Sequence, residues 1–198
     1  MRMLERLMIA THSAGKFTEF ANSLGGMAAF IEPLPTDAEG PEETGASFLE
    51  NALIKARFAA AKWRVPVLAD DSGLVVDALN GAPGVYSARF AGSQASDLDR
   101  QALLLERLRG VPPCERRARF VAALVLLAPG RGEWTAMGTC EGRIAMEPAG
   151  AGGFGYDPLF YYPPSGKTFG QMSSDEKQRI SHRTAALREL IRRFRAGP

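Results

Sequence analysis

The stretch VLADDSGL, from Val67 to Leu74, decides how the rest of the 198-residue chain is interpreted. An apolar run typical of a buried strand leads directly into two adjacent carboxylates. Neighbouring side chains of a regular strand point to opposite faces, so Asp70 and Asp71 face one cavity only if the strand ends there. Ser72-Gly73 is typical of a turn, and we predict that the strand ends at it. Two acids at a strand end favour a divalent-cation site or a general base, and a solvated polar turn is the alternative.

Length and composition indicate one ordinary globular domain covering residues 1–198. Domains usually contain about 100–200 residues, and 45% hydrophobic with 23% charged residues is typical of that class. The formal charge of +2 is too near balance to indicate a nucleic-acid or membrane partner. Cys114 and Cys140 match no metal-ligand spacing and fit a reducing cytosol. We see no signal peptide, and the longest apolar run, Val121 to Ala128, is far shorter than the roughly 20 residues of a membrane helix, so we predict a cytoplasmic protein.

The first loop is a candidate phosphate site. The strand-like run Leu7 to Ala10 is followed by THSAGK, Thr11 to Lys16, and then by a helical pattern from Phe17 to Leu24. Free N–H groups at a helix N-terminus bind anions, and Lys16 adds a cation. A Walker A motif is excluded, because it needs Gly where Ala10 stands and Ser or Thr where Phe17 stands. The alternative is a simple turn with a solvated lysine.

The second helix carries a possible ligand pair. A loop rich in proline, glycine and acids ends at Glu42-Glu43-Thr44-Gly45, and a capping box at Ser47 and Glu50 opens a helix to about Trp63. Asn51 and Lys55 lie four residues apart on one helix face, so both can reach one ligand. A solvent-facing pair is the alternative.

A second glycine-rich loop spans Gly150 to Pro158. Its letters match the dinucleotide fingerprint, but that motif needs a helix directly afterwards, and here a strand-like run from Leu159 to Tyr162 follows. We therefore reject a Rossmann site. What remains is a loop whose backbone approaches a ligand closely, with Phe154 or Tyr156 offering a ring on which a base can stack.

The rest of the chain adds strands, helices and a basic tail. Arginines near the C-terminus are interpreted as a solvated basic face, so no nucleic-acid partner is expected. The predicted elements are strands at Ala28–Glu32, Leu74–Leu79, Arg116–Leu127 and Glu133–Thr139, the last two joined by a Pro-Gly-Arg-Gly hairpin, and helices at Ser96–Leu108 and Ser173–Phe194.

Taken together and in this order, the motifs resemble one family, the RdgB-type inosine/xanthosine triphosphate pyrophosphatases, from about residue 7 to residue 190. The carrying motifs are Thr11–Lys16, Glu42–Gly45, Phe48–Ala52, Ala69–Leu74, Gly81–Arg89, Gly152–Pro158 and Ser181–Arg183. The resemblance implies an α/β fold with an elongated mixed sheet flanked by helices, and two lobes with a central substrate cleft. One departure is Ser13, where the family usually carries Asn; the shorter side chain puts a direct phosphate contact in doubt.

The resemblance also implies an activity: hydrolysis of ITP, dITP and XTP to the monophosphate and pyrophosphate, with Mg²⁺. Asp71 is then the proton acceptor, Glu43 and Asp71 hold the metal, and Asp70 is a further ligand or lies just behind the ligands. The sequence leaves open an exchange of roles between Asp70 and Asp71. The residues implied at the phosphates are Thr11, His12, Ser13, Ala14, Gly15, Lys16 and Lys55, and Ser72 is implied to touch the substrate.

The base end is implied to use hydrogen-bond donors. Hypoxanthine and xanthine present a 6-oxo acceptor where adenine presents an amine, so donors reject adenine by being left unpaired. The implied residues are Phe154, Gly155, Tyr156, Asp157, Lys177, His182 and Arg183. The family is typically homodimeric.

Two rival functions remain. A Maf-like nucleotide pyrophosphatase shares the reaction type but prefers other bases. A nucleotide- or RNA-binding module without catalysis is weakly favoured by the basic tail and by Ser13. A binding module without catalysis does not need the predicted catalytic side chains. Their presence therefore argues against it; they are Glu43, Asp70, Asp71, Lys16 and Lys55.

Overall fold

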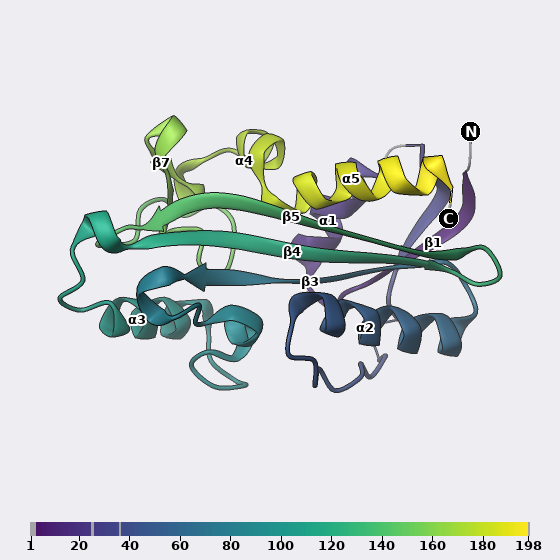
Figure 1. Cartoon of the computed structure of the whole chain (residues 1–198), viewed down its shortest axis with the longest axis horizontal. Coiled ribbons are helices and arrows are strands. Elements are labelled where there is room, and N and C mark those ends of the chain that lie inside the picture. The colour runs from purple at the N-terminus through teal and green to yellow at the C-terminus, as the bar shows by residue number, and fades with distance from the viewer. Residues whose placement is uncertain (1–2, 25, 36, 198) are drawn as a thin grey trace. The chain divides into compact units, whose positions relative to one another are not determined.

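The computed structural model describes residues 3–24, 26–35 and 37–197 of the chain (Figure 1). The strands are β1 Leu4–Ala10, β2 Ala28–Pro33, β3 Val67–Val76, β4 Arg117–Ala128, β5 Gly132–Ile144, β6 Phe160–Tyr162 and β7 Lys167–Thr168. The α-helices are α1 Ala14–Ser23, α2 Phe48–Trp63, α3 Asp97–Arg107, α4 Ser174–Ile180 and α5 His182–Ala196. Short 3₁₀ turns lie at Asp77–Leu79, Gly84–Arg89, Pro113–Glu115, Pro163–Ser165 and Phe169–Gln171.

The strands form one mixed sheet in the order β2-β1-β3-β4-β5-β6-β7. β1 pairs in parallel with β2 and β3, whereas β6 pairs antiparallel with both β5 and β7. This confirms the predicted α/β class with a mixed sheet flanked by helices.

The chain divides into two compact units, each with its own apolar core. The first unit comprises residues 1–71, 122–138 and 182–198. Its core joins β1 and β4 to α1 and α5, with the Trp134 and Phe194 rings in an edge-to-face contact at 5.1 Å. Within this unit α1 packs against α5, and α2 and α5 lie on opposite sides of the strands (Figure 1). Helices therefore cover both faces of this part of the sheet.

The second unit comprises residues 72–121 and 139–181. Its core contains a cluster of three rings, with centroids of Phe120 and Phe160 4.5 Å apart and of Phe160 and Phe169 4.8 Å apart. Leu104 and Leu108, at the end of α3, are fully buried in the same core. The apolar face expected for this helix from Leu98, Ala102, Leu105 and Leu108 is only partly buried, because Leu98 and Ala102 are exposed.

The prediction that the acidic strand ends at Ser72-Gly73 is wrong. β3 continues without interruption through both residues to Val76, and only Asp77–Leu79 forms a 3₁₀ turn where further strand was expected. Ladder pairing along the whole strand outweighs the local turn preference of Ser-Gly, since tertiary context routinely overrides such preferences. An unbroken strand directs adjacent side chains to opposite faces, so Asp70 and Asp71 face opposite sides of the sheet.

Most other elements confirm the sequence analysis. α2, α3, β2 and the β4–β5 hairpin lie where expected, and the last helical region is interrupted at Ser181 between α4 and α5. α1 begins at Ala14 instead of Phe17, because Ser13 serves as its N-cap and accepts a hydrogen bond from the Lys16 N–H at 3.3 Å.

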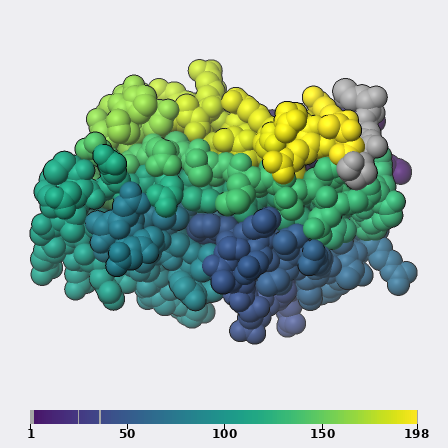
Figure 2. Space-filling view, in the orientation of Figure 1, coloured from purple at the N-terminus to yellow at the C-terminus, as the bar shows by residue number. Residues whose placement is uncertain are grey.

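No helix within the described ranges has the length and apolar character to cross a membrane. α5, yellow in the surface view, displays part of its outer face there (Figure 2). On that helix Glu189 pairs with both Arg192, at 2.8 Å, and Arg193, at 2.6 Å. These exposed ion pairs agree with the interpretation of the arginine tail as a solvated face.

Candidate active site

The register of β1 and β3 brings the first loop beside the acids. Ala10, the last residue of β1, pairs with Ala69 of β3, so the first loop leaves the sheet level with Asp70, while β3 itself continues to Val76. The carboxyl ends of parallel strands are where α/β proteins bind ligands. The Ser13 N–H donates to Thr11 Oγ1 at 3.1 Å, which fixes the turn that leads into α1.

Asp71 faces α2 and is held by two side chains of that helix. Lys55 Nζ lies 2.8 Å from Asp71 Oδ1, and Asn51 Nδ2 donates to Asp71 Oδ2 at 3.3 Å. The same lysine lies 3.3 Å from Glu43 Oε1, so two carboxylates converge on one ammonium group. Asn51 and Lys55 therefore share one helix face as predicted and both contact Asp71, whereas their binding of a common ligand stays a prediction.

Asn51 was predicted to share a helix face with Lys55 but was not included among the catalytic, substrate-binding or metal-binding residues. It is fully buried, and its Oδ1 accepts a hydrogen bond from the Gly45 N–H at 2.8 Å. A Cβ at Gly45 would lie only 2.7 Å from Asn51 Oδ1, so glycine permits this close approach. Asn51 therefore ties the Glu43 loop to Asp71. Its four-residue spacing from Lys55 was the available signal.

Asp70 faces the opposite side of β3 and serves a different set of cations. Lys16 Nζ lies 2.7 Å from Asp70 Oδ2, and Arg183 Nε lies 3.9 Å from the same oxygen. Arg183 also pairs with Glu19 of α1 through Nη1 at 2.8 Å. Asp70 thus links the first-loop lysine to the first turn of α5. The expectation that both acids look into one cavity because the strand ends is incorrect.

The two acids are electrostatically unequal. Burial raises the pKa of Asp71 above the usual aspartate value, and Lys55 opposes that rise only in part. Burial acts in the same direction on Asp70, but Lys16 and Arg183 outweigh it and hold the pKa of Asp70 below its usual value. Asp70 therefore stays ionised as a counter-ion, whereas Asp71 has the higher proton affinity that a general base needs.

The acids around Lys55 fit a magnesium ion in part. Within the described ranges, no three His, Cys, Asp or Glu side chains are grouped so that they could hold a metal by themselves. Mg²⁺ often takes only one or two carboxylates and completes its shell with water and substrate phosphates. Glu43 and Asp71, which already converge on one cation, supply such a pair of hard oxygen donors.

A small pocket of about 70 Å³ adjoins these side chains in the first unit. His12, Glu43 and Lys55 line it together with apolar residues of α2, among them Phe58. His12 therefore lies near the acid end, although it is largely exposed. His12 is the first-loop residue among those that line this pocket, and the binding roles of the loop stay a prediction.

Ser13 acts first as a helix cap. We expect Ser13→Ala to lower the free energy of unfolding by about 1 kcal/mol, because the Lys16 N–H loses its acceptor. Ser13→Asn keeps a capping oxygen, so stability should be retained and the apparent affinity for triphosphate should improve at most modestly. Chemical denaturation and KM measurements on both variants check this. A large loss of affinity in Ser13→Asn would contradict it.

The second unit holds a buried ion pair in the predicted base loop. Lys177 Nζ lies 2.6 Å from Asp157 Oδ2, and both residues are buried. The Phe154 N–H donates to the same carboxylate oxygen at 2.9 Å, and Lys177 Nζ lies 4.6 Å from the Phe154 ring centroid. The structure therefore brings together Phe154, Asp157 and Lys177.

Tyr156 is a core residue of the second unit. The residue is 4% exposed, and its hydroxyl donates to the Ser87 carbonyl at 2.9 Å. Burial raises the pKa of this phenol. The expectation that Tyr156 offers a ring for stacking is therefore wrong, since the glycine loop turns it inward. Phe154, which is half-buried, keeps that role open.

The remaining predicted base residues lie in the first turn of α5, in the first unit. His182 and Arg183 are both buried there. A Cβ at Gly138 of β5 would lie 2.3 Å from the His182 carbonyl oxygen, so glycine allows the helix to approach the strand this closely. Ser72 follows Asp71 on β3 and is half-buried.

A capped helix N-terminus at the end of β1, with two lysines and two acids beside it, combines features with which α/β proteins bind phosphate groups. A model of the Ham1 family matches residues 7–193. The chain is 47% identical over 189 residues to the dITP/XTP pyrophosphatase of Geobacillus kaustophilus, a match covering 94% of this chain and 93% of that protein. It is 48% identical over 194 residues to a dITP/XTP pyrophosphatase of Thermus thermophilus, covering 98% of this chain and 93% of that protein.

A solved structure agrees with these relatives. The Staphylococcus aureus Ham1 protein shares 39% identity with this chain at a TM-score of 0.85, covering 96% of this chain and 98% of that protein. The chain belongs to the Ham1 family. This confirms the resemblance carried by the sequence motifs.

Proposed function

We propose that the protein hydrolyses the non-standard purine nucleoside triphosphates ITP, dITP and XTP to the monophosphate and pyrophosphate, and so cleanses the nucleotide pool. The observation that carries the proposal is Asp71, which Lys55 and Asn51 hold beside Glu43 at the sheet edge reached by the first loop. The similarity to proteins named dITP/XTP pyrophosphatases supports the same activity.

In the proposed reaction, Asp71 accepts a proton from the water that attacks the α-phosphorus, and the bond to the bridging oxygen of the pyrophosphate breaks. Asp71 suits this role because burial raises the pKa of its carboxyl group, so that it binds a proton more readily than an exposed aspartate. Asn51 orients the carboxylate through Oδ2, which leaves Oδ1 shared with Lys55. Asp70, on the other face, is assigned the task of holding Lys16 and Arg183.

The phosphates are assigned to the first loop and to the two lysines. Thr11 to Lys16 supply N–H groups and a cation at the N-terminus of α1. Lys16 can move from Asp70 to a phosphate, because its ammonium sits on a flexible side chain. Lys55 adds positive charge beside Asp71. Ser72, next to this acid, is assigned to the substrate.

Glu43 and Asp71 would hold Mg²⁺, whereas Asp70, expected from the resemblance as a further ligand or just behind the ligands, lies on the opposite face of β3 and pairs with Lys16. When bound, the ion neutralises charge on the triphosphate and favours deprotonation of a coordinated water. The fit rests on two carboxylates that converge on one cation, an arrangement to which substrate phosphates can add the remaining ligands.

The purine base is assigned to donors and a ring. In the second unit, Phe154 offers a ring face, and Gly155, Asp157 and Lys177 form its immediate surroundings; Tyr156 supports this loop from the core. His182 and Arg183, which the resemblance also implies at the base, are hydrogen-bond donors in the first unit, at the start of α5. A site rich in donors favours a 6-oxo purine over adenine, because adenine leaves a donor unpaired.

The direct test is a substrate profile with identified products. We expect pyrophosphate release from ITP, dITP and XTP with Mg²⁺ to exceed release from ATP and GTP by about 100-fold or more in kcat/KM. EDTA should abolish turnover, and added Mg²⁺ should restore it. Ion chromatography of the products distinguishes pyrophosphate from orthophosphate. Orthophosphate as the first product, or no turnover, refutes the proposal.

The rivals differ in the same assay. A Maf-like enzyme would prefer nucleotides that carry other bases, such as dTTP. A binding module would bind the nucleotide without hydrolysing it.

We also propose that residues 1–198 act as one catalytic domain in a cytoplasmic homodimer. In support of a single domain, β3, β4 and β5 each supply residues to both units. Light scattering on the assayed preparation checks for twice the 21.3 kDa chain mass.

A further inference from the structure

We infer that Asp97 and Gln101 of α3 are positioning residues that clamp the base-recognition loop at Gly155. This inference rests on the proposed function, because it assigns these residues to the purine end of the substrate. It concerns only side chains of the second unit.

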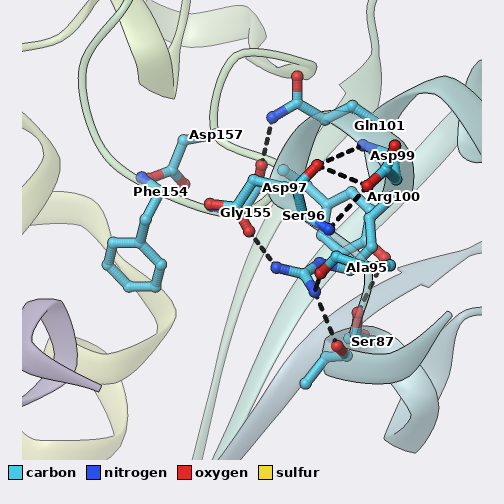
Figure 3. Close-up of polar contacts among 12 residues, drawn as sticks. Ser87, Ala95, Ser96, Asp97, Asp99, Arg100, Gln101, Phe154, Gly155 and Asp157 are labelled. Carbon is cyan, nitrogen blue, oxygen red and sulfur yellow. Dashed lines mark hydrogen bonds and ion pairs between the residues drawn. The ribbon is translucent and has the colours of Figure 1, made fainter. Parts of the chain in front are cut away.

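Two side chains of α3 hold the Gly155 backbone from both sides of its Cα (Figure 3). The Gly155 N–H donates to Asp97 Oδ2 at 2.7 Å, and Gln101 Nε2 donates to the Gly155 carbonyl at 2.5 Å. Residues four apart on a helix lie on one face, so one turn of α3 satisfies both polar groups of this residue. A bond that a carboxylate accepts is among the stronger kinds of hydrogen bond.

Asp97 is itself held in place. Arg100 Nη2 donates to Asp97 Oδ1, and Arg100 Nη1 donates to the Ala88 carbonyl at 2.9 Å and the Ala95 carbonyl at 2.6 Å. Gln101 is only 5% exposed, so its amide has little freedom to turn away. Both side chains that hold Gly155, those of Asp97 and Gln101, are therefore restricted in their motion.

The clamped residue lies between the two rings of the loop. Gly155 adopts φ +63°, a conformation that glycine reaches readily, and this turn directs Phe154 and Tyr156 differently. Tyr156 is fixed through its hydroxyl to Ser87, whereas the Phe154 ring lies away from the α3 side chains in Figure 3. Because Phe154 is next to the clamped peptide, the clamp sets where its ring face can meet a base.

The Phe154 N–H, Asp157 and Lys177 form the other support of this loop. That support contains groups assigned to the base, whereas Asp97 and Gln101 contact the Gly155 backbone in the loop. Their effect on the substrate therefore passes through the loop. The roles of Asp97 and Gln101 can therefore be tested independently of the role assigned to Lys177.

The test compares binding of a triphosphate with and without a base. Kd values for ITP and for inorganic tripolyphosphate are measured by calorimetry in EDTA for the wild type, Asp97→Ala and Gln101→Leu. We expect the Kd for ITP to rise about tenfold in each variant, because a hydrogen bond that orders the loop is lost, while the Kd for tripolyphosphate stays unchanged. With Mg²⁺, KM for ITP should rise and kcat should stay within about twofold.

Two further variants separate positioning from helix stability. Asp99→Asn weakens the capping box of α3, in which Asp99 accepts from the Ser96 N–H at 2.8 Å, without touching Gly155. It should lower the melting temperature and leave both Kd values alone. Asp97→Asn retains an oxygen acceptor for the Gly155 N–H and should recover part of the lost ITP affinity.

Several results would overturn the inference. These are an unchanged Kd for ITP in both variants, a parallel rise in the Kd for tripolyphosphate, or an equal loss of ITP affinity in Asp99→Asn. Wild-type protein that binds ITP but does not hydrolyse it would refute the proposed reaction while leaving the clamp test intact. Wild-type protein that does not bind ITP would refute both.

Discussion

Replacing Asp71 with Asn is expected to lower kcat for ITP by about 10³-fold while the protein remains folded, since general-base catalysis contributes roughly 10²–10⁴. The amide has the shape of the carboxylate but cannot accept a proton from water. The amide has a single oxygen, so at position 71 it can accept from Lys55 Nζ or from Asn51 Nδ2 but not from both, while Lys55 keeps its pairing with Glu43. Single-turnover kinetics and thermal unfolding measure the two parts of this prediction.

A second Asp-to-Asn substitution, away from the site, controls for the loss of one negative charge. Asp77, in the turn that follows β3, is exposed and pairs with Arg119 at 2.8 Å. Asp77→Asn should change kcat by less than about twofold, because exposed ion pairs contribute little. Near-normal activity of Asp71→Asn would show that another group takes the proton, and the assignment of the base would then fail.

Replacing Lys55 with Met is expected to lower kcat/KM for ITP by about 100-fold and to move the acid limb of its pH profile to higher pH. Lys55 lies within 3.3 Å of both Asp71 and Glu43, and its charge opposes the rise that burial causes in the pKa of Asp71. The base works only when deprotonated, so activity falls as pH decreases through that pKa. Without Lys55 the pKa rises further, and the fall begins at higher pH.

The pH profile of kcat/KM checks this prediction, with Lys62→Met as the control. Lys62 is an exposed lysine near the end of the same helix, where its ammonium lies 4.9 Å from the Trp63 ring centroid. This lysine packs over aromatic rings and not beside the two acids, so the profile of the variant should match the wild type. An acid limb that stays in place, or moves to lower pH, in Lys55→Met would show that Lys55 does not control the base.

Local patterns predicted much of the molecule. The spacing of Asn51 and Lys55 on a capped helix anticipated their contact with one group, because helix periodicity fixes which side chains share a face. The β4–β5 hairpin followed from two apolar runs around a Pro-Gly-Arg-Gly turn. The first loop lies beside the acids because β1 and β3 pair in parallel.

The errors come from contacts between distant segments. Ser72-Gly73 prefers a turn locally, but pairing within the sheet keeps β3 extended there. The inward orientation of Tyr156 depends on the Ser87 carbonyl, 69 residues earlier in the chain. Asp97 and Gln101 meet Gly155 across 58 and 54 residues, and no pattern within α3 marks them as more than helix-surface polar residues.

The unbroken course of β3 also limits how this family member can change. Side chains of a strand alternate with a period of two, so inserting or deleting a single residue ahead of Asp70 would exchange the faces of the two acids. Asp70 would then face Lys55 of α2, and Asp71 would face Lys16. Insertions or deletions in this part of the strand are therefore tolerated only when they change its length by an even number of residues. Loops elsewhere in the chain are not restricted in this way.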